Sequence, residues 1–182
     1  MLSEQQLIKD CQRGKKSSQY ELVRRYSGML LTICRRYASD EAMAKDILQE
    51  TLIRIFTQID KYRATGSFEG WMRRIAVRTA LNWLDRKYIR RETYPVELEA
   101  DGHLDPTILD QLGAEEILKL VQGLPLGFRT VFNLYAIEGY THQEIAELLQ
   151  ISESASRSQL SRARRLLQKK FNTSQISKFR SA

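Results

Sequence analysis

Residues 140–171 read YTHQEIAELLQISESASRSQLSRARRLLQKKF, which predicts two helices joined by a tight turn. Thr141 and Glu144 have the spacing of a capping box, and apolar residues then recur at helical intervals. Ser152 is a typical N-cap for a second helix, whose first turn contains Glu153. The pattern is typical of a helix-turn-helix. An αα-hairpin within a helical bundle is the alternative.

The second of these helices is basic. Leu160, Ala163 and Leu167 recur every three or four residues and are predicted to face inward. The opposite face is then formed by Arg157, Ser158, Ser161, Arg162 and Arg165. We expect this face to have no acidic residue. Arginines separated by small hydroxyls suit a helix lying in the major groove of DNA.

The composition agrees with a nucleic-acid partner and a helical fold. The 182 residues have a formal net charge of +7 and a pI near 9.5, so an acidic polymer is the expected partner. Nine glycines and three prolines are few for a turn-rich β fold. The length suits one medium domain or two small ones. We therefore expect an all-α protein.

A reversal of charge divides the chain. Residues 61–91 contain nine basic and two acidic residues, interleaved with aromatic ones. Residues 92–116 contain eight acidic residues and no Lys or Arg, and their prolines and glycines interrupt a helix. The predicted organisation is an N-terminal helical domain at 1–91, an acidic linker at 92–107, and a C-terminal helix-turn-helix domain at 108–182.

The predicted helices of both domains have apolar stripes. In the helix that begins near Ser17, the inward residues are predicted to be Tyr20, Val23, Tyr26, Leu30, Ile33 and Tyr37. The next helix, capped by Asp40, is predicted to leave Asp46, Gln49, Glu50 and Arg54 outside. A helix at 128–138 is predicted to bury Val131, Phe132 and Tyr135. In the 61–91 segment, accessible Tyr62 and Trp71 rings would hold unstacked bases; a surface helix with core tryptophans is the alternative.

Motifs of enzymes and cofactor sites are missing from the sequence. It has no phosphate-binding glycine motif, no HExxH, and no paired Cys/His spacing, so we predict no catalytic residue, cofactor or metal. His103 lies near Asp101 and Asp105, but a solvated histidine is expected there rather than a metal ligand. Cys11 and Cys34 are predicted to be buried cytosolic thiols. Without a signal pattern or a long apolar run, we expect a cytoplasmic protein that does not insert into a membrane.

Three stretches together resemble a known family. They are DILQETLIRIF at 46–56, FEGWMRRIAVRTALNWL at 68–84 and YTHQEIAELLQISESASRSQLSRAR at 140–164. In order and spacing they resemble a bacterial extracytoplasmic-function (ECF) sigma factor. The resemblance implies a non-enzymatic alternative sigma factor that binds core RNA polymerase at its clamp and flap. It would direct initiation by recognising −35 and −10 promoter DNA and helping to open the −10 element. It also implies an anti-sigma partner and a free protein that is monomeric.

The resemblance also assigns roles to residues. The polymerase-binding set is Asp46, Gln49, Glu50 and Arg54. The set for −10 DNA is Tyr62, Arg63, Phe68, Trp71, Arg74, Arg78 and Asn82. The set for −35 DNA is Arg157, Ser158, Ser161, Arg162 and Arg165. The sequence departs from the family at Arg78, where asparagine is usual, and at Ser156 and Gln159, so the preferred promoter sequences are expected to differ.

Three other functions compete with this interpretation. A helix-turn-helix regulator that is not a polymerase subunit would explain 141–171 but not the aromatic and basic 61–91 segment. An enzyme acting on nucleic acid lacks the motifs named above. An adaptor would use the basic faces to bind acidic proteins. Specific transcription starts with core polymerase distinguish the sigma factor from all three.

Overall fold

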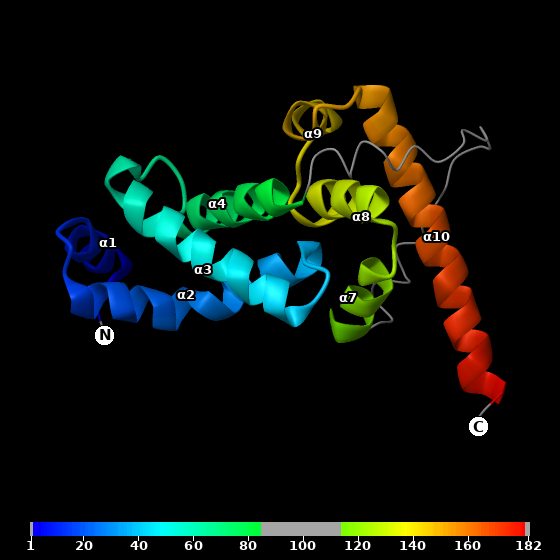
Figure 1. Cartoon of the computed structure of the whole chain (residues 1–182), viewed down its shortest axis with the longest axis horizontal. Coiled ribbons are helices and arrows are strands. Elements are labelled where there is room, and N and C mark those ends of the chain that lie inside the picture. Colours follow the sequence, from blue (N-terminus) through cyan, green and yellow to red (C-terminus); the bar gives the residue numbers. More distant parts are fainter. Residues whose placement is uncertain (1, 85–113, 181–182) are drawn as a thin grey trace. The chain divides into compact units, whose positions relative to one another are not determined.

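The computed structural model describes residues 2–84 and 114–180 (Figure 1). Every regular element in these two ranges is helical, which confirms the all-α prediction. Contacts divide the chain into two compact units, Met1–Leu84 and Asp85–Ala182. The predicted linker at 92–107 and the end of the predicted helix up to Arg91 lie outside the described residues, so those boundaries stay predictions.

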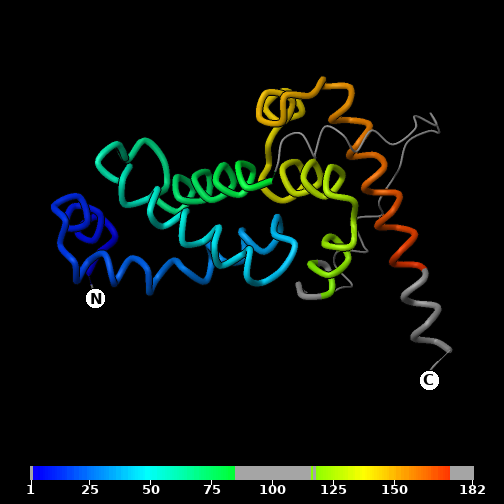
Figure 2. Tube along the Cα trace, in the orientation of Figure 1, coloured from blue at the N-terminus to red at the C-terminus, as the bar shows by residue number. Residues whose placement is uncertain are grey.

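Unit 1 is formed by four α-helices and one short 3₁₀ helix. They are α1 (Glu4–Gln12), α2 (Lys16–Tyr37), α3 (Glu41–Gln58), η1 (Ile59–Lys61) and α4 (Phe68–Trp83). Helices α2, α3 and α4 pack against one another, and α1 packs against α2 and η1 (Figures 1 and 2). The side chains of Ser3, Asp40 and Ser67 cap α1, α3 and α4 by accepting a backbone N–H. Gly14 ends α1 at φ 74°.

The inward stripe of α2 differs from the prediction at its N-terminal end. Tyr20 is 73% exposed and Val23 is only half-buried, so the prediction that both face the core was wrong. Ser18 and Leu22 are buried instead, while Leu30, Ile33 and Tyr37 are buried as predicted. Because α2 packs against α1, α3 and α4, its buried face at this end follows the neighbouring helices and not the position of its aromatic residues.

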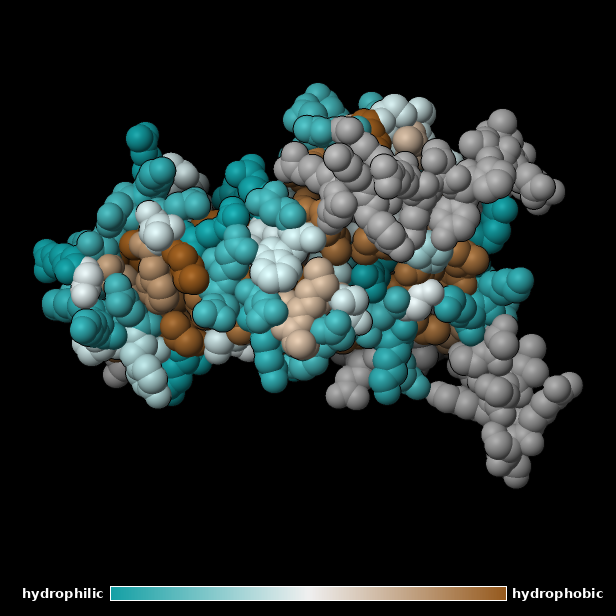
Figure 3. Space-filling view, viewed as in Figure 1, coloured by the Kyte–Doolittle hydropathy of each residue, from teal (hydrophilic) through white to brown (hydrophobic). Residues whose placement is uncertain are grey.

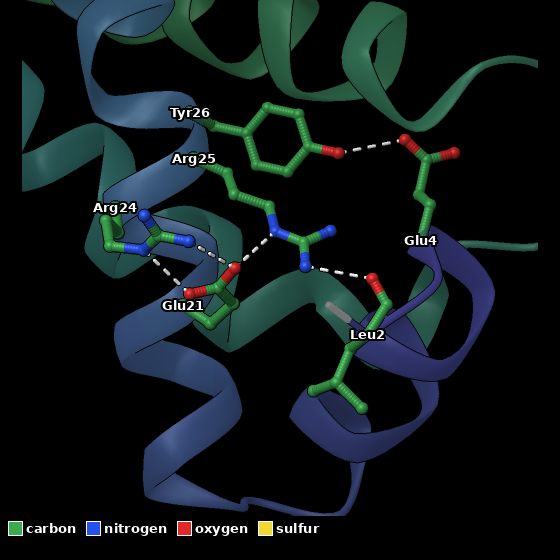
Figure 4. A network of polar contacts seen from close by, with 6 residues as sticks. All are labelled: Leu2, Glu4, Glu21, Arg24, Arg25 and Tyr26. Carbon is green, nitrogen blue, oxygen red and sulfur yellow. Dashed lines mark hydrogen bonds and ion pairs between the residues drawn. The ribbon is translucent and has the colours of Figure 1, made fainter.

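A polar network joins α1 to α2 (Figure 4). Glu21 accepts hydrogen bonds from Arg24 and Arg25. Its carboxylate oxygens lie 2.8 Å from Arg24 Nε and 2.6 Å from Arg25 Nε. Arg25 also donates to the carbonyl of Leu2 at 2.8 Å. The hydrogen bonds from Arg24 and Arg25 lower the pKa of Glu21 to about 2. The network fixes the start of the chain against the middle of α2.

Unit 2 is formed by the remaining described helices. They are α7 (Ala114–Gln122), α8 (Leu126–Phe132), the π-helical η2 (Asn133–Ile137), α9 (His142–Leu149) and α10 (Glu153–Arg180). Helix α10 packs against α7, α8 and α9. The π turn corrects one prediction: Leu134 is buried, whereas Tyr135, predicted to face inward, is 37% exposed. A π turn contains more residues than an α turn, so it rotates the residues that follow Phe132.

Helices α9 and α10 form the predicted helix-turn-helix. Thr141 and Glu144 make both bonds of the capping box. Gln150 adopts a left-handed conformation at φ 54°, and the Ser152 hydroxyl accepts the N–H of Ala155 at 3.0 Å. Helices α9 and α10 pack against each other, and five of their apolar side chains are buried: Ile145, Leu149, Leu160, Ala163 and Leu167.

Candidate nucleic-acid and polymerase interfaces

An aromatic cluster lies where η1 leads into α4. The ring centroids of Phe68 and Trp71 are 5.6 Å apart with the rings nearly parallel, and Tyr62 lies 5.1 Å from Phe68 and 5.4 Å from Trp71. Tyr26 of α2 contacts the other side of Phe68 edge-on at 5.9 Å. Such geometries are favourable for aromatic pairs. The cluster therefore holds the rings of Tyr62 and Trp71, both half-buried, at the surface of unit 1.

Phe68 is the base of this cluster and not part of its surface. Its side chain is fully buried, so the prediction that it contacts DNA directly does not fit the structure. The sequence alone did not separate Phe68 from Trp71, because both lie in the first turn of α4. Rings from two other segments, Tyr26 and Tyr62, cover Phe68. We therefore describe Phe68 as a packing residue that positions Tyr62 and Trp71.

A hydrogen bond closes the loop before α4, and two others tie α1 to its neighbours. The Tyr62 hydroxyl donates to the carbonyl of Gly66 at 2.6 Å, and Figure 2 shows the loop between η1 and α4. The Gln12 amide donates to the carbonyl of Ile59 at 3.1 Å, which joins α1 to η1. The Tyr26 hydroxyl donates to Glu4 at 2.9 Å (Figure 4). Burial, followed by this bond, raises the pKa of Tyr26 to about 12.

Polar residues extend from the cluster along α4. Arg74, Arg78 and Asn82 follow one another at four-residue intervals and are exposed, so they share one face of the helix. Arg63 is exposed in the loop. Arg73, by contrast, pairs with Glu69 at 2.7 Å. Of the predicted set for −10 DNA, Trp71, Arg74, Arg78 and Asn82 thus share one face of α4, and Phe68 is buried.

The predicted polymerase-binding residues of α3 divide into two kinds. Asp46 and Gln49 are exposed, as predicted. Glu50 and Arg54 are half-buried and bonded to each other, with 2.8 Å between Arg54 Nε and Glu50 Oε1. The indole N–H of Trp83 donates to the other Glu50 oxygen at 2.5 Å, and this bond, followed by that of Arg54, lowers the pKa of Glu50. Glu50 therefore joins α3 to α4, which its position in the sequence did not indicate.

The basic face of α10 matches the prediction in position but includes an acid. Arg157, Ser158 and Arg165 are exposed, and Ser161 and Arg162 are half-buried. Glu153, one turn earlier, forms an ion pair with Arg157. The expectation of an acid-free face was therefore wrong, because residues four apart on a helix are neighbours.

A second cluster lies at the start of α9. The ring of His142 stacks on Tyr135 with 4.5 Å between centroids, and the Arg164 guanidinium lies 5.8 Å from the Tyr135 ring. His142 Nδ1 is 2.9 Å from the hydroxyl of Ser156, which is fully buried. These contacts connect η2, α9 and α10. Sequence reasoning gave His142 no role, because its partners come from two other elements, Tyr135 from η2 and Ser156 from α10.

This cluster predicts a pH dependence of stability. Burial lowers the pKa of His142 below its ordinary 6.5; Arg157 and Arg164 act in the same direction, and Glu153 opposes them. Below pH 6.5 the unfolded chain then binds more protons than the folded one, so stability falls as pH decreases towards the folded pKa. We expect His142→Gln to reduce the loss of thermal stability between about pH 7.5 and pH 5.5. His103→Gln, which replaces the other histidine, is the control and should retain the wild-type dependence of thermal stability on pH.

The described residues offer no sign of a metal site or a membrane span. Groups of three or more His, Cys, Asp or Glu side chains that could hold a metal do not occur in the described ranges. In the same ranges, none of the helices has the length and apolar character needed to cross a bilayer. On the face shown in Figure 3, the apolar side chains form patches that are bordered by hydrophilic side chains. Cys11 and Cys34 are free, buried thiols, and burial raises the pKa of Cys34 to about 11.

Comparisons with known proteins agree with this arrangement. Sigma-70 region 2 matches residues 22–90, and Sigma-70 region 4 matches residues 114–167. An ECF RNA polymerase sigma-E factor of Haemophilus influenzae is 28% identical over 93% of this chain and 95% of its own length. An RNA polymerase sigma-H factor of Pseudomonas aeruginosa is 29% identical over 91% and 92%. The sigma factor RpoE of Bartonella quintana, solved with the anti-sigma factor NepR, has a similar fold: TM-score 0.51, 20% identity, 82% of this chain and 94% of that one.

Two helical units, with all but the last six residues of the region 2 match in the first and the region 4 match in the second, define a sigma factor of the sigma-70 class. Within that class, the chain belongs to the extracytoplasmic-function (ECF) sigma factors. Its function is therefore to direct promoter-specific transcription initiation as an alternative sigma factor, and it is an initiation factor without enzymatic activity. The resemblance found in the sequence is confirmed.

Proposed function

We propose that the two units divide promoter recognition and polymerase binding between the surfaces described above. Unit 1 binds the clamp of core RNA polymerase through α3 and captures the opened −10 strand at the aromatic cluster. Unit 2 reads the −35 element with α10 and docks on the flap. The observation that supports this most is the pair of half-exposed rings, Tyr62 and Trp71, beside the exposed arginines of α4.

Single-strand capture suits the chemistry of the cluster. Bases stack on aromatic side chains whatever their sequence, and cations along the path bind the phosphates. Tyr62 and Trp71 supply the rings, while Arg63, Arg74 and Arg78 supply exposed charge. Taking a base out of the duplex costs a few kcal/mol, which stacking offsets. This surface therefore suits an opened strand more than an intact duplex.

The test of the proposed function is reconstitution. The full chain is mixed with bacterial core polymerase and a library of promoter fragments, and transcription starts are mapped. We expect specific starts that core polymerase alone does not give. A helix-turn-helix regulator or an adaptor gives none under these conditions, so the absence of specific starts would reject the proposal.

The exposed residues of α3 lead to a prediction about polymerase binding. Asp46→Lys together with Gln49→Lys should weaken core binding by about tenfold or more, because one change reverses a negative charge and the other adds a positive charge, and both oppose a basic partner surface. Both side chains are exposed, so the helical content should not change. Binding is measured by titration of labelled protein with core polymerase. Lys45→Glu, at another exposed position of α3, is the matched control and should not weaken binding.

The remaining partners follow from the family. We propose that an anti-sigma factor binds the free protein and holds it inactive; the sigma factor RpoE of Bartonella quintana was solved in complex with the anti-sigma factor NepR. We expect the free chain to be monomeric, to act in the cytoplasm where RNA polymerase works, and to need no cofactor. Size measurement of the purified chain tests the monomer directly.

A further inference from the structure

The buried stripe of α10 begins with a polar residue. Leu160, Ala163 and Leu167 are buried, and Ser156, one turn before Leu160, is fully buried on the same face of the helix. Ser156 closes the first turn of α10, at a position where the sequence departs from the family. A buried hydroxyl costs free energy unless it has a hydrogen-bond partner. The N-terminal end of this stripe therefore needs a polar partner.

His142, the first residue of α9, is that partner. Its Nδ1 atom lies 2.9 Å from Ser156 Oγ, and a neutral ring with its proton on Nε2 accepts the hydroxyl hydrogen at Nδ1. The imidazole is itself held by its stack on Tyr135, whose ring lies 5.8 Å from the Arg164 guanidinium. Since η2 holds the imidazole and the imidazole holds the hydroxyl, the start of α10 is tied to both preceding elements.

We propose that His142 and Ser156 are positioning residues for promoter recognition, and that their hydrogen bond sets the direction in which Arg157 and Ser158 project from the first turn of α10. Arg157 directly follows Ser156, so a rotation of this turn moves the guanidinium relative to the bases of the −35 element. The inference rests on the proposed function and deepens it, because the two residues influence base preference without contacting a base.

A hydrogen bond fixes the orientation of this turn more closely than apolar packing does. Apolar contacts are non-directional, whereas a hydrogen bond weakens as its angle departs from linearity. The other hydrogen bonds of the turn among the described residues stay within it: the Ser152 hydroxyl accepts the N–H of Ala155, and the Ser152 carbonyl accepts that of Ser156, both at 3.0 Å. These bonds keep the turn helical but do not orient it towards α9.

The precision that base reading requires makes such a bond useful. Groups that recognise a ligand must be held within about 0.5 Å of the productive geometry by packing and by hydrogen bonds behind them. A single polar contact in an apolar seam can also fix the register of two helices at some cost in stability. The bond between His142 and Ser156 has this position, because it lies at the end of the α9–α10 seam that is nearest Arg157.

The experiment measures base preference on a promoter library randomised across the −35 element, using the full chain with core polymerase. Ser156→Ala and His142→Gln each remove the bond, and each should relax the preference at the base pair that Arg157 reads by about two- to tenfold. The double variant should relax it no further, because both changes act through one bond. His142→Asn should retain the preference, since its amide oxygen and nitrogen are bonded to Cγ, as Nδ1 is, whereas the glutamine amide lies one carbon further out.

Leu167→Val is the matched control for a loss of stability alone. Leu167 is buried in the same stripe, about three turns after Ser156, so the smaller side chain should lower thermal stability and leave the relative −35 preference unchanged. If the bond between His142 and Ser156 had a purely structural role, Ser156→Ala and His142→Gln would behave in the same way. All variants are compared at a temperature at which circular dichroism shows them folded.

The outcomes separate this inference from the proposed function. If Arg157→Ala changes the −35 preference while Ser156→Ala and His142→Gln retain it, the positioning role is rejected and the proposed function stands. If the effects of the two single variants add in the double variant, they do not act through one bond, and the positioning role is rejected as well. If the wild-type protein initiates without any −35 preference, the proposed reading of this element by α10 itself fails.

Discussion

Replacing Trp71 by alanine is expected to slow promoter opening by about 5- to 150-fold, because loss of one base–aromatic stack costs about 1–3 kcal/mol. The formation of the closed complex on duplex DNA should change much less, since the ring is expected to engage a base only after unstacking. Tyr62→Ala should act in the same direction, since its ring lies 5.4 Å from that of Trp71. Permanganate footprinting of the opened strand measures the effect.

Two controls separate capture of the strand from damage to the fold. Phe68→Leu removes buried packing at the base of the cluster, so it should lower thermal stability and affect closed and open complexes alike. A template with a pre-melted −10 region should restore much of the activity of Trp71→Ala but none of that lost by an unfolded domain. If Trp71→Ala weakens closed and open complexes equally and the bubble gives no rescue, Trp71 is a core residue and not a capture residue.

Local features of the fold were predictable from the sequence. The predicted capping residues Asp40, Thr141 and Ser152 act within three residues along the chain, and each accepts the backbone N–H expected of it. Helical periodicity likewise placed the buried residues of α10. Such interactions depend on sequence spacing alone, so no knowledge of the tertiary structure was needed.

The differences arise where one element determines the environment of another. Phe68 is buried by rings from α2 and the loop, and Glu50 bonds an indole 33 residues later. Tyr135 faces outward because a π turn interrupts the α-helical repeat. Periodicity assigns one face per helix and contains no information about which neighbour covers it. The predicted exposure of side chains such as Asp46 and Arg157 on regular helix faces was therefore correct, whereas the burial of side chains that meet another element was not predicted.

The basic face of α10 leads to the second large effect, which is a change of promoter choice. Residues early in a recognition helix lie deepest in the groove, so Arg157 and Ser158 are expected to contact base edges. Losing a bidentate arginine–guanine contact costs about 1–3 kcal/mol at one base pair. Arg157→Ala should therefore relax the preference at one −35 position by about 5- to 150-fold, measured on a library randomised across that element.

Arg165 and Glu153 supply the comparisons for Arg157. Arg165, two turns further along, is expected to contact phosphate, so Arg165→Ala should weaken all sequences alike and lower the salt slope by about one. Glu153 pairs with Arg157 in the free protein, and this exposed pair must open when the guanidinium contacts a base. Glu153→Gln should therefore raise affinity without changing the preferred sequence. If Arg157→Ala instead loses activity uniformly and keeps the wild-type preference at every −35 position, another residue of α10 reads the base.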